Sequence, residues 1–154
     1  MNSSYNSDMS RIYDLVPTLL EAGTPNIAGV IGFGSVIEYL NKIDFDKATK
    51  YELELKKYAL EKLKENSNIL IYNEKSEGSI IAINYNDIFA QDLAIYLNKY
   101  NICVRAGNHC SKILKDELNI KNTVRISFSF YNTKEEIDKL IDALNNPNIK
   151  NEIL

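Results

Sequence analysis

The sequence lacks several features, and each absence excludes a class of protein. Basic residues are not in excess, because the formal net charge is −3, which excludes a generally basic nucleic-acid binder. No apolar run approaches the roughly 20 residues that a membrane span requires. The first residues contain neither a basic nor an apolar region, so no secretory signal is visible and a cytoplasmic location is expected. In that compartment the two cysteines are expected to be thiols and not a disulfide.

The residues that are present fit one folded domain. Of the 154 residues, 45% are hydrophobic, which is enough for one core and too many for a disordered chain. Arginine is scarce, with 3 residues against 15 lysines, and there is a single histidine. Because a scarce residue type indicates a specific use, the first candidates for function are Arg11, Arg105, Arg125 and His109.

Apolar periodicity predicts a series of helices and strands. Residues 27–40 have near-helical spacing, and the three glycines among them indicate close backbone packing. From residue 46 onward the expected order is helix, strand, strand, helix, strand, strand, helix. Asp87 is expected to cap the middle helix, and Thr133 to Glu136 form a capping box for the last. The expected strands are 69–72, 80–83, 102–104 and 123–128, and the first helix is 46–66.

This order of elements predicts an α+β fold. The expected architecture is a small, mainly antiparallel sheet with helices packed on one face. No glycine pattern typical of dinucleotide-binding or phosphate-binding loops occurs.

The segment from Val104 to Cys110 concentrates the residues that can carry chemistry. It leaves an expected strand and enters a loop, where functional groups are commonly presented. A thiolate is the nucleophilic form of cysteine, and Arg105 or a protonated His109 would favour that form of Cys110. Gly107 permits the tight turn that would bring His109 and Cys110 together.

Plainer interpretations stay open on these residues alone. A lone cysteine beside a lone histidine is often incidental, and Arg125 is compatible with a simple surface charge on a strand. Cys103 lies in an apolar strand and is expected to be a small core residue. A zinc site of Cys103, His109 and Cys110 has too few ligands and unsuitable spacing, so no metal site is expected.

Three motifs, in the same order along the chain, resemble the cysteine desulfurases. Arg-Ala-Gly-Asn-His-Cys110 resembles the catalytic-cysteine loop of the short-loop group, which includes selenocysteine lyases. The stretch from Val124 to Asp138 resembles the closing strand and helix of that family, and Glu21 to Gly29 resembles its mid-chain turn. The resemblance implies the small C-terminal domain of a fold-type I pyridoxal phosphate enzyme in the class V aminotransferase family.

The resemblance also implies a reaction. The family uses pyridoxal phosphate as an electron sink to take sulfur from L-cysteine, which leaves L-alanine. Cys110 matches the nucleophile that becomes a persulfide. Arg125 matches the residue that holds the substrate carboxylate, a role that suits a bidentate guanidinium better than lysine. Arg105 is expected to assist through the electrostatic field of its positive charge at the loop.

Four further residues take supporting roles by the same resemblance. His109, Asn108 and Gly107 belong to the loop motif, although Asn108 stands where many members have a second histidine. Thr24 matches a residue that reaches the cofactor phosphate of the neighbouring subunit, and a hydroxyl just before a helix suits a phosphate. The alternative is that Gly23 to Asn26 are only a turn and a helix start.

One element of the family is missing from the sequence. The lysine that forms the Schiff base with the cofactor usually follows a histidine, whereas the residue after His109 is Cys110. The expected organisation is a partial N-terminal segment (1–20), a small domain of cysteine desulfurase type (21–146) and a fraying tail (147–154). If the chain is separated from a large domain, Ile31, Phe33 or Val36 are expected to be exposed.

The expected function is therefore that of half an enzyme. The chain would be inactive alone and would need a large domain that binds pyridoxal phosphate, or a homodimer partner. An acceptor protein would then take the sulfur for iron–sulfur cluster assembly or other sulfur transfer. Two alternatives are a catalytically silent truncated module and a persulfide relay in which Cys110 accepts sulfur from another protein. No nucleic acid or membrane partner is expected.

Overall fold

A computed structural model describes residues 23–153, and the chain divides into a unit that ends at Asp44 and a unit from Phe45 to Leu154. The expected N-terminal segment (1–20), Arg11 and the first residues of the Glu21–Gly29 motif lie outside the described residues. No helix within the described part is both long and apolar enough to cross a membrane.

The first unit contains one described helix, α2 (Ile27–Leu40). The Asn26 side chain caps it by accepting a hydrogen bond of 3.0 Å from the Gly29 amide. A Cβ atom on Gly29 would collide with that capping side chain, whereas no atom lies close to Gly32 or Gly34. The close backbone packing expected at Gly32 and Gly34 is therefore not formed within the described residues and stays a prediction.

Helix α2 is apolar on all sides and buries none of its residues. The exposed fractions of Ile31, Phe33 and Val36 are 66%, 67% and 50%, which confirms the predicted exposure. A helix that is hydrophobic all round is normally a buried one, so α2 has the composition of a helix that packs against further protein.

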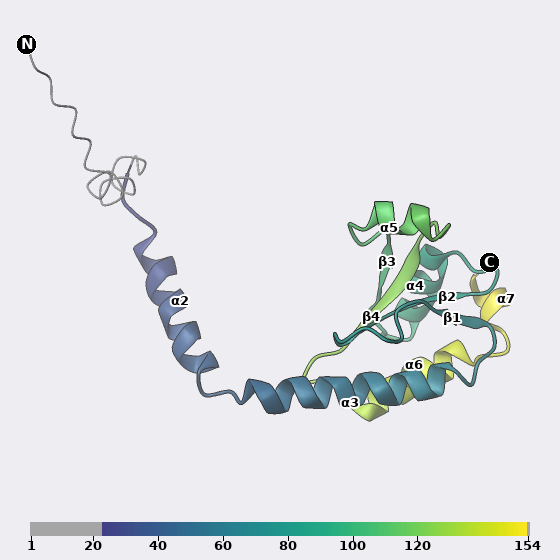
Figure 1. The fold of residues 1–154 in the computed structure, drawn as a ribbon, viewed down its shortest axis with the longest axis horizontal. Coiled ribbons are helices and arrows are strands. Elements are labelled where there is room, and N and C mark those ends of the chain that lie inside the picture. The colour runs from purple at the N-terminus through teal and green to yellow at the C-terminus, as the bar shows by residue number, and fades with distance from the viewer. Residues whose placement is uncertain (1–22, 154) are drawn as a thin grey trace, which may run out of the picture. The chain divides into compact units, whose positions relative to one another are not determined.

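The second unit is built on a four-stranded antiparallel sheet in the order β1-β2-β4-β3 (Figure 1). β2 pairs with both β1 and β4, and β3 pairs with β4 and forms one edge of the sheet. The sheet confirms the predicted α+β class. Its strands are β1 (Ile69–Ile71), β2 (Ile80–Tyr85), β3 (Arg105–Gly107) and β4 (Thr123–Ser127).

Three helices cover one face of this sheet: α3 (Phe45–Leu63), α4 (Ala90–Lys99) and α6 (Lys134–Leu144). Their apolar stripes meet alternate residues of the strands in one cluster, because successive side chains of a strand point to opposite faces. The predicted capping box opens α6, since Thr133 and Glu136 bond each other's backbone amides. The fully buried core residues are Leu55, Ala59, Leu63, Ile81, Ile83, Leu93, Leu97, Val124 and Leu144.

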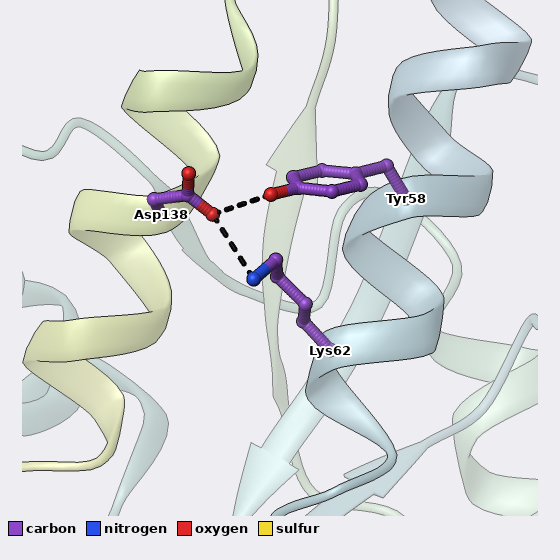
Figure 2. Close-up of polar contacts among 3 residues, drawn as sticks. All are labelled: Tyr58, Lys62 and Asp138. Atoms are coloured by element: carbon purple, nitrogen blue, oxygen red, sulfur yellow. Dashed lines mark hydrogen bonds and ion pairs between the residues drawn. The ribbon is translucent and has the colours of Figure 1, made fainter.

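Helices α3 and α6 are also joined at their surface by a polar cluster (Figure 2). The Tyr58 hydroxyl donates to Asp138 Oδ1 at 2.7 Å, and Lys62 Nζ lies 3.3 Å from the same oxygen. The hydrogen bond from Tyr58, followed by that from Lys62, lowers the pKa of Asp138. The bond to Asp138 raises the pKa of Tyr58 in return.

The β1–β2 connection is held by a buried lysine of α3. Lys56 is only 4% exposed, and its ammonium donates to Ser76 Oγ at 2.9 Å and to the Gly78 carbonyl at 2.8 Å. It also donates to the Ser76 carbonyl. All of these acceptors are neutral oxygens, so Lys56 fixes the connection between β1 and β2 without an ion pair.

The structure corrects several local predictions. The third strand is 105–107 and not 102–104, because the Ile102 amide bonds Leu97 O as α4 ends, and pairing with β4 starts only at Arg105. Asp87 does not cap α4, which begins at Ala90 after Phe89 with no side-chain cap. Asp87 instead has a φ of 60° and pairs with Lys150 at 3.2 Å.

Two short helices were not expected from the sequence. α5 (Lys112–Glu117) follows the motif that ends in Cys110, and α7 (Ile149–Ile153) replaces most of the expected fraying tail. α7 packs on α4 through Ile149, which is 3% exposed. Glu152 of α7 accepts a hydrogen bond of 2.8 Å from Tyr100. The side-chain hydrogen bond between Tyr100 and Tyr96, followed by the bond to Glu152, raises the pKa of Tyr100 to about 12.

Candidate active site

The motif that contains Cys110 forms a tight loop at the end of β3, here called the thiol loop (Gly107–Ser111). The Ser111 amide and hydroxyl both donate to the Asn108 carbonyl, at 3.0 and 2.8 Å. The two residues inside this turn, His109 and Cys110, have φ values of 52° and 60°. Left-handed backbone costs a non-glycine residue about 1–2 kcal/mol, so the chain holds two adjacent residues in a strained conformation. Such strain is often found at functional sites.

The turn exposes the thiol and tethers the imidazole. Cys110 is exposed, whereas His109 is half-buried. His109 Nε2 lies 2.9 Å from the Thr123 carbonyl of β4, and because a carbonyl only accepts, Nε2 carries the proton. Gly107 has a φ of 133°, which glycine adopts readily, and it allows the loop to leave the strand.

Two arginines lie opposite each other on the sheet face that the core helices do not cover. Arg105 of β3 is paired in register with Arg125 of β4, and Arg125 is flanked by Val124 and Ile126, which point into the core. Like charges directly opposite each other destabilise a sheet. None of the ion pairs described within residues 23–153 involves either arginine, and Arg125 Nε is buried without a hydrogen-bond partner. This pair is suited to bind an anion such as a carboxylate.

A third cation at this end of the sheet was not identified from the sequence. Lys115 of α5 is 6% exposed and donates to the Gly107 carbonyl and, at 3.1 Å, to Thr123 Oγ1. In the sequence Lys115 is one of 15 lysines, and nothing in its surroundings distinguishes it from a surface residue. Burial lowers the pKa of its ammonium.

The imidazole is surrounded by positive charge. The pKa of His109 is lowered, first by burial and then by the charges of Lys115, Arg125 and Arg105, while the bond to Thr123 acts in the opposite direction. The neutral form is therefore favoured at pH 7. Its Nδ1 atom is then a lone-pair acceptor, and this atom is buried without a partner.

Two further residues were singled out in the sequence. Cys103 is exposed and not in the core, so that prediction is wrong, and it lines a cavity of about 460 Å³ with Ile126, Phe128 and Leu140. Thr24 is exposed in the segment before α2 and belongs to the first unit. Within the second unit, the structure brings the thiol loop together with both arginines.

The described residues do not by themselves fit a pyridoxal phosphate site. Of the lysines, Lys115 is the one bonded to the thiol loop, and its ammonium is occupied by the oxygens of Gly107 and Thr123. A Schiff base needs a lysine whose amine is free to react. Among the described residues there is no group of three or more His, Cys, Asp or Glu side chains that could hold a metal ion.

The chain is similar to cysteine desulfurases over most of its length. A cysteine desulfurase from Wigglesworthia glossinidia brevipalpis is 40% identical over 132 residues, which are 86% of this chain and 32% of that relative. A probable cysteine desulfurase from Staphylococcus aureus strain N315 is 44% identical over 131 residues, again 32% of its length. The chain thus spans about a third of the curated relatives that it matches.

Solved structures agree with this similarity. The cysteine desulfurase CsdA from Escherichia coli, in an S-sulfonic acid form, superimposes with a TM-score of 0.75 at 34% identity, over 84% of this chain and 32% of that one. An apo cysteine desulfurase from Thermococcus onnurineus NA1 superimposes with a TM-score of 0.72, also at 34% identity, over 80% of this chain and 32% of that one. The family model for aminotransferase class-V matches residues 2–140. The chain therefore belongs to the aminotransferase class-V family.

Proposed function

We propose that this chain is the thiol-bearing part of a cysteine desulfurase. The observation that carries the proposal is the exposed thiol of Cys110 in a strained turn, at the same end of the sheet as an arginine pair that takes part in no ion pair described within residues 23–153. The thiol supplies a nucleophile, and the guanidinium groups supply a binding site for a carboxylate. L-cysteine carries both the sulfur and the carboxylate that such a site requires.

In this proposal Arg125 binds the carboxylate of L-cysteine, assisted by Arg105. The Cys110 thiolate attacks the substrate sulfur, so an S–S bond forms while the substrate C–S bond breaks. The electron pair of the C–S bond stays on the carbon, which takes a proton and becomes the methyl group of L-alanine. Cys110 is left as a persulfide, and an acceptor protein takes its outer sulfur for iron–sulfur cluster assembly or another sulfur transfer.

The electron sink for this reaction comes from outside the described residues. Because they do not fit pyridoxal phosphate, a large domain beyond the described residues must hold the cofactor and its Schiff-base lysine. Thr24 is proposed to reach the cofactor phosphate of a neighbouring subunit. The chain alone is therefore expected to be inactive, and the proposed setting is the cytoplasm.

Complementation tests this function directly. The full chain is mixed with pyridoxal phosphate, L-cysteine and the part of the Staphylococcus aureus relative that this chain does not cover. We expect L-alanine only when both polypeptides are present, and a gain of one sulfur atom on Cys110 by mass spectrometry. Cys110→Ser should abolish alanine formation, whereas the matched control Cys103→Ser should leave it unchanged.

Two results would overturn the proposal. One is alanine formation by this chain and the cofactor without a large domain, and the other is a Cys110→Ser variant as active as its parent. The exposure of Cys110 also favours the persulfide relay as a second candidate. A small-molecule persulfide separates the two, because a relay takes sulfur onto Cys110 even when complementation yields no alanine. A silent module does neither.

A further inference from the structure

We propose that Lys115 is a positioning residue that ties the thiol loop to β4 and thereby holds the His109 imidazole as the Nε2–H tautomer, with Nδ1 unprotonated. The proposal rests on the geometry of the loop and not on the proposed function. Lys115 would thus act through His109 and not on the substrate.

The surroundings of Lys115 indicate that it has a role other than stabilising the fold. Its ammonium is buried, and its acceptors are the Gly107 carbonyl and the Thr123 hydroxyl, both of them neutral. No ion pair described within residues 23–153 involves it. Burying a charge without an opposite charge is costly, and an apolar side chain of similar size would avoid that cost.

The two acceptors of Lys115 lie on the two sides of the joint between the loop and the sheet. Gly107 is the last residue of β3 and begins the thiol loop, and Thr123 is its partner in register on β4. Thr123 also accepts the Nε2–H of His109 through its carbonyl. One residue of β4 therefore anchors the start of the loop through its hydroxyl and the imidazole through its carbonyl. Such second contacts determine which nitrogen of a histidine carries the proton.

The charges around His109 come from every element that surrounds the loop. They are Lys115 on α5, Arg125 on β4 and Arg105 on β3, and all of them oppose protonation of the imidazole. The neutral ring therefore presents Nδ1 as an unprotonated nitrogen.

Nuclear magnetic resonance tests this arrangement, because His109 is the only histidine of the chain. In the full chain labelled with ¹⁵N-histidine, long-range ¹⁵N–¹H spectra report the tautomer and the titration of one ring. We expect the Nε2–H tautomer at neutral pH and a pKa below the ordinary value of about 6.5. In Lys115→Met the pKa should rise toward that value, and a mixture of tautomers should appear.

Lys56→Met is the matched control. Lys56 is an equally buried lysine with neutral acceptors, but those acceptors belong to the β1–β2 hairpin. Its loss should lower stability without changing the titration of His109. If Lys115→Met does not fold, Thr123→Val removes the hydroxyl acceptor with little change of shape and should produce the same mixture of tautomers. Lys115→Arg keeps the charge and should retain a lowered pKa.

An Nδ1–H tautomer in the parent chain would overturn the proposal. So would a His109 titration that is the same in Lys115→Met as in the parent, or a shift of equal size in Lys56→Met. These spectra need neither cofactor nor substrate, so their outcome is independent of the complementation experiment. In a complemented enzyme, the acidic limb of the pH–rate profile should move with the His109 pKa in Lys115→Met, which a purely structural role would not cause.

Discussion

The two faces of the four-stranded sheet differ in composition and in use. On the face covered by α3, α4 and α6, the alternate residues of β2 and β4 are apolar and almost completely buried, as in Ile83 and Val124. On the other face the same strands carry Arg125 and Ser127, and β3 adds Arg105. One strand therefore contributes to stability with every second residue and to the candidate site with the residues between. Substitutions on the covered face are expected to change the stability of the fold, and substitutions on the other face are expected to change activity.

The largest expected effect on the fold comes from the covered face. Ile83→Ala removes a side chain that is fully buried in the core, and a truncation of this kind costs about 2–5 kcal/mol of the free energy of unfolding. Ser127→Ala, at an exposed position on the opposite face, should stay within about 0.5 kcal/mol. Urea denaturation followed by circular dichroism measures both. Equal losses in the two variants would contradict the division between the faces.

The opposite pattern is expected for Arg125→Gln. In a complemented enzyme the loss of a charged hydrogen-bond donor to the substrate carboxylate should raise KM for L-cysteine by about tenfold to a hundredfold. The free energy of unfolding should not fall, because the variant relieves the repulsion between Arg125 and Arg105. Lys121→Gln makes the same change of charge at an exposed position and should leave KM unchanged. A loss of stability without a change in KM would contradict substrate binding by Arg125 and would show that its role is structural.

The smallest expected effect lies in the surface cluster of Tyr58, Lys62 and Asp138. Because the pKa of Asp138 is lower in the folded chain, its ionised form stabilises the fold above the unfolded value of about 3.9. That contribution disappears as the pH falls through the lowered folded pKa. The difference in stability between the parent and Asp138→Asn should be small, since the cluster is exposed, and constant above about pH 5. It should shrink on further acidification, and a difference that grew instead would contradict this assignment.

The elements with strong periodicity could be predicted from the sequence, and the boundaries with weak local signals could not. The helix that contains Leu55 and the capping box at Thr133 were both recognisable, because their signals lie within a few adjacent residues. The apolar run Ile102–Val104 looked like a strand, but strand formation needs a partner in register, and β4 pairs only from Arg105. Cys103 was assigned to the core for the same reason and is exposed.

The site shows the same division. The scarcity of arginine, histidine and cysteine was enough to select Arg105, Arg125, His109 and Cys110, because residue identity is visible in the sequence. Sequence alone also established the family motifs, the net charge and the absence of a long apolar run. That the two arginines oppose each other was decided by the antiparallel register, which depends on residues about twenty positions apart. The burial of Lys115 and its bond to Thr123 were likewise decided only by the tertiary structure, because burial depends on what the rest of the chain places around a residue.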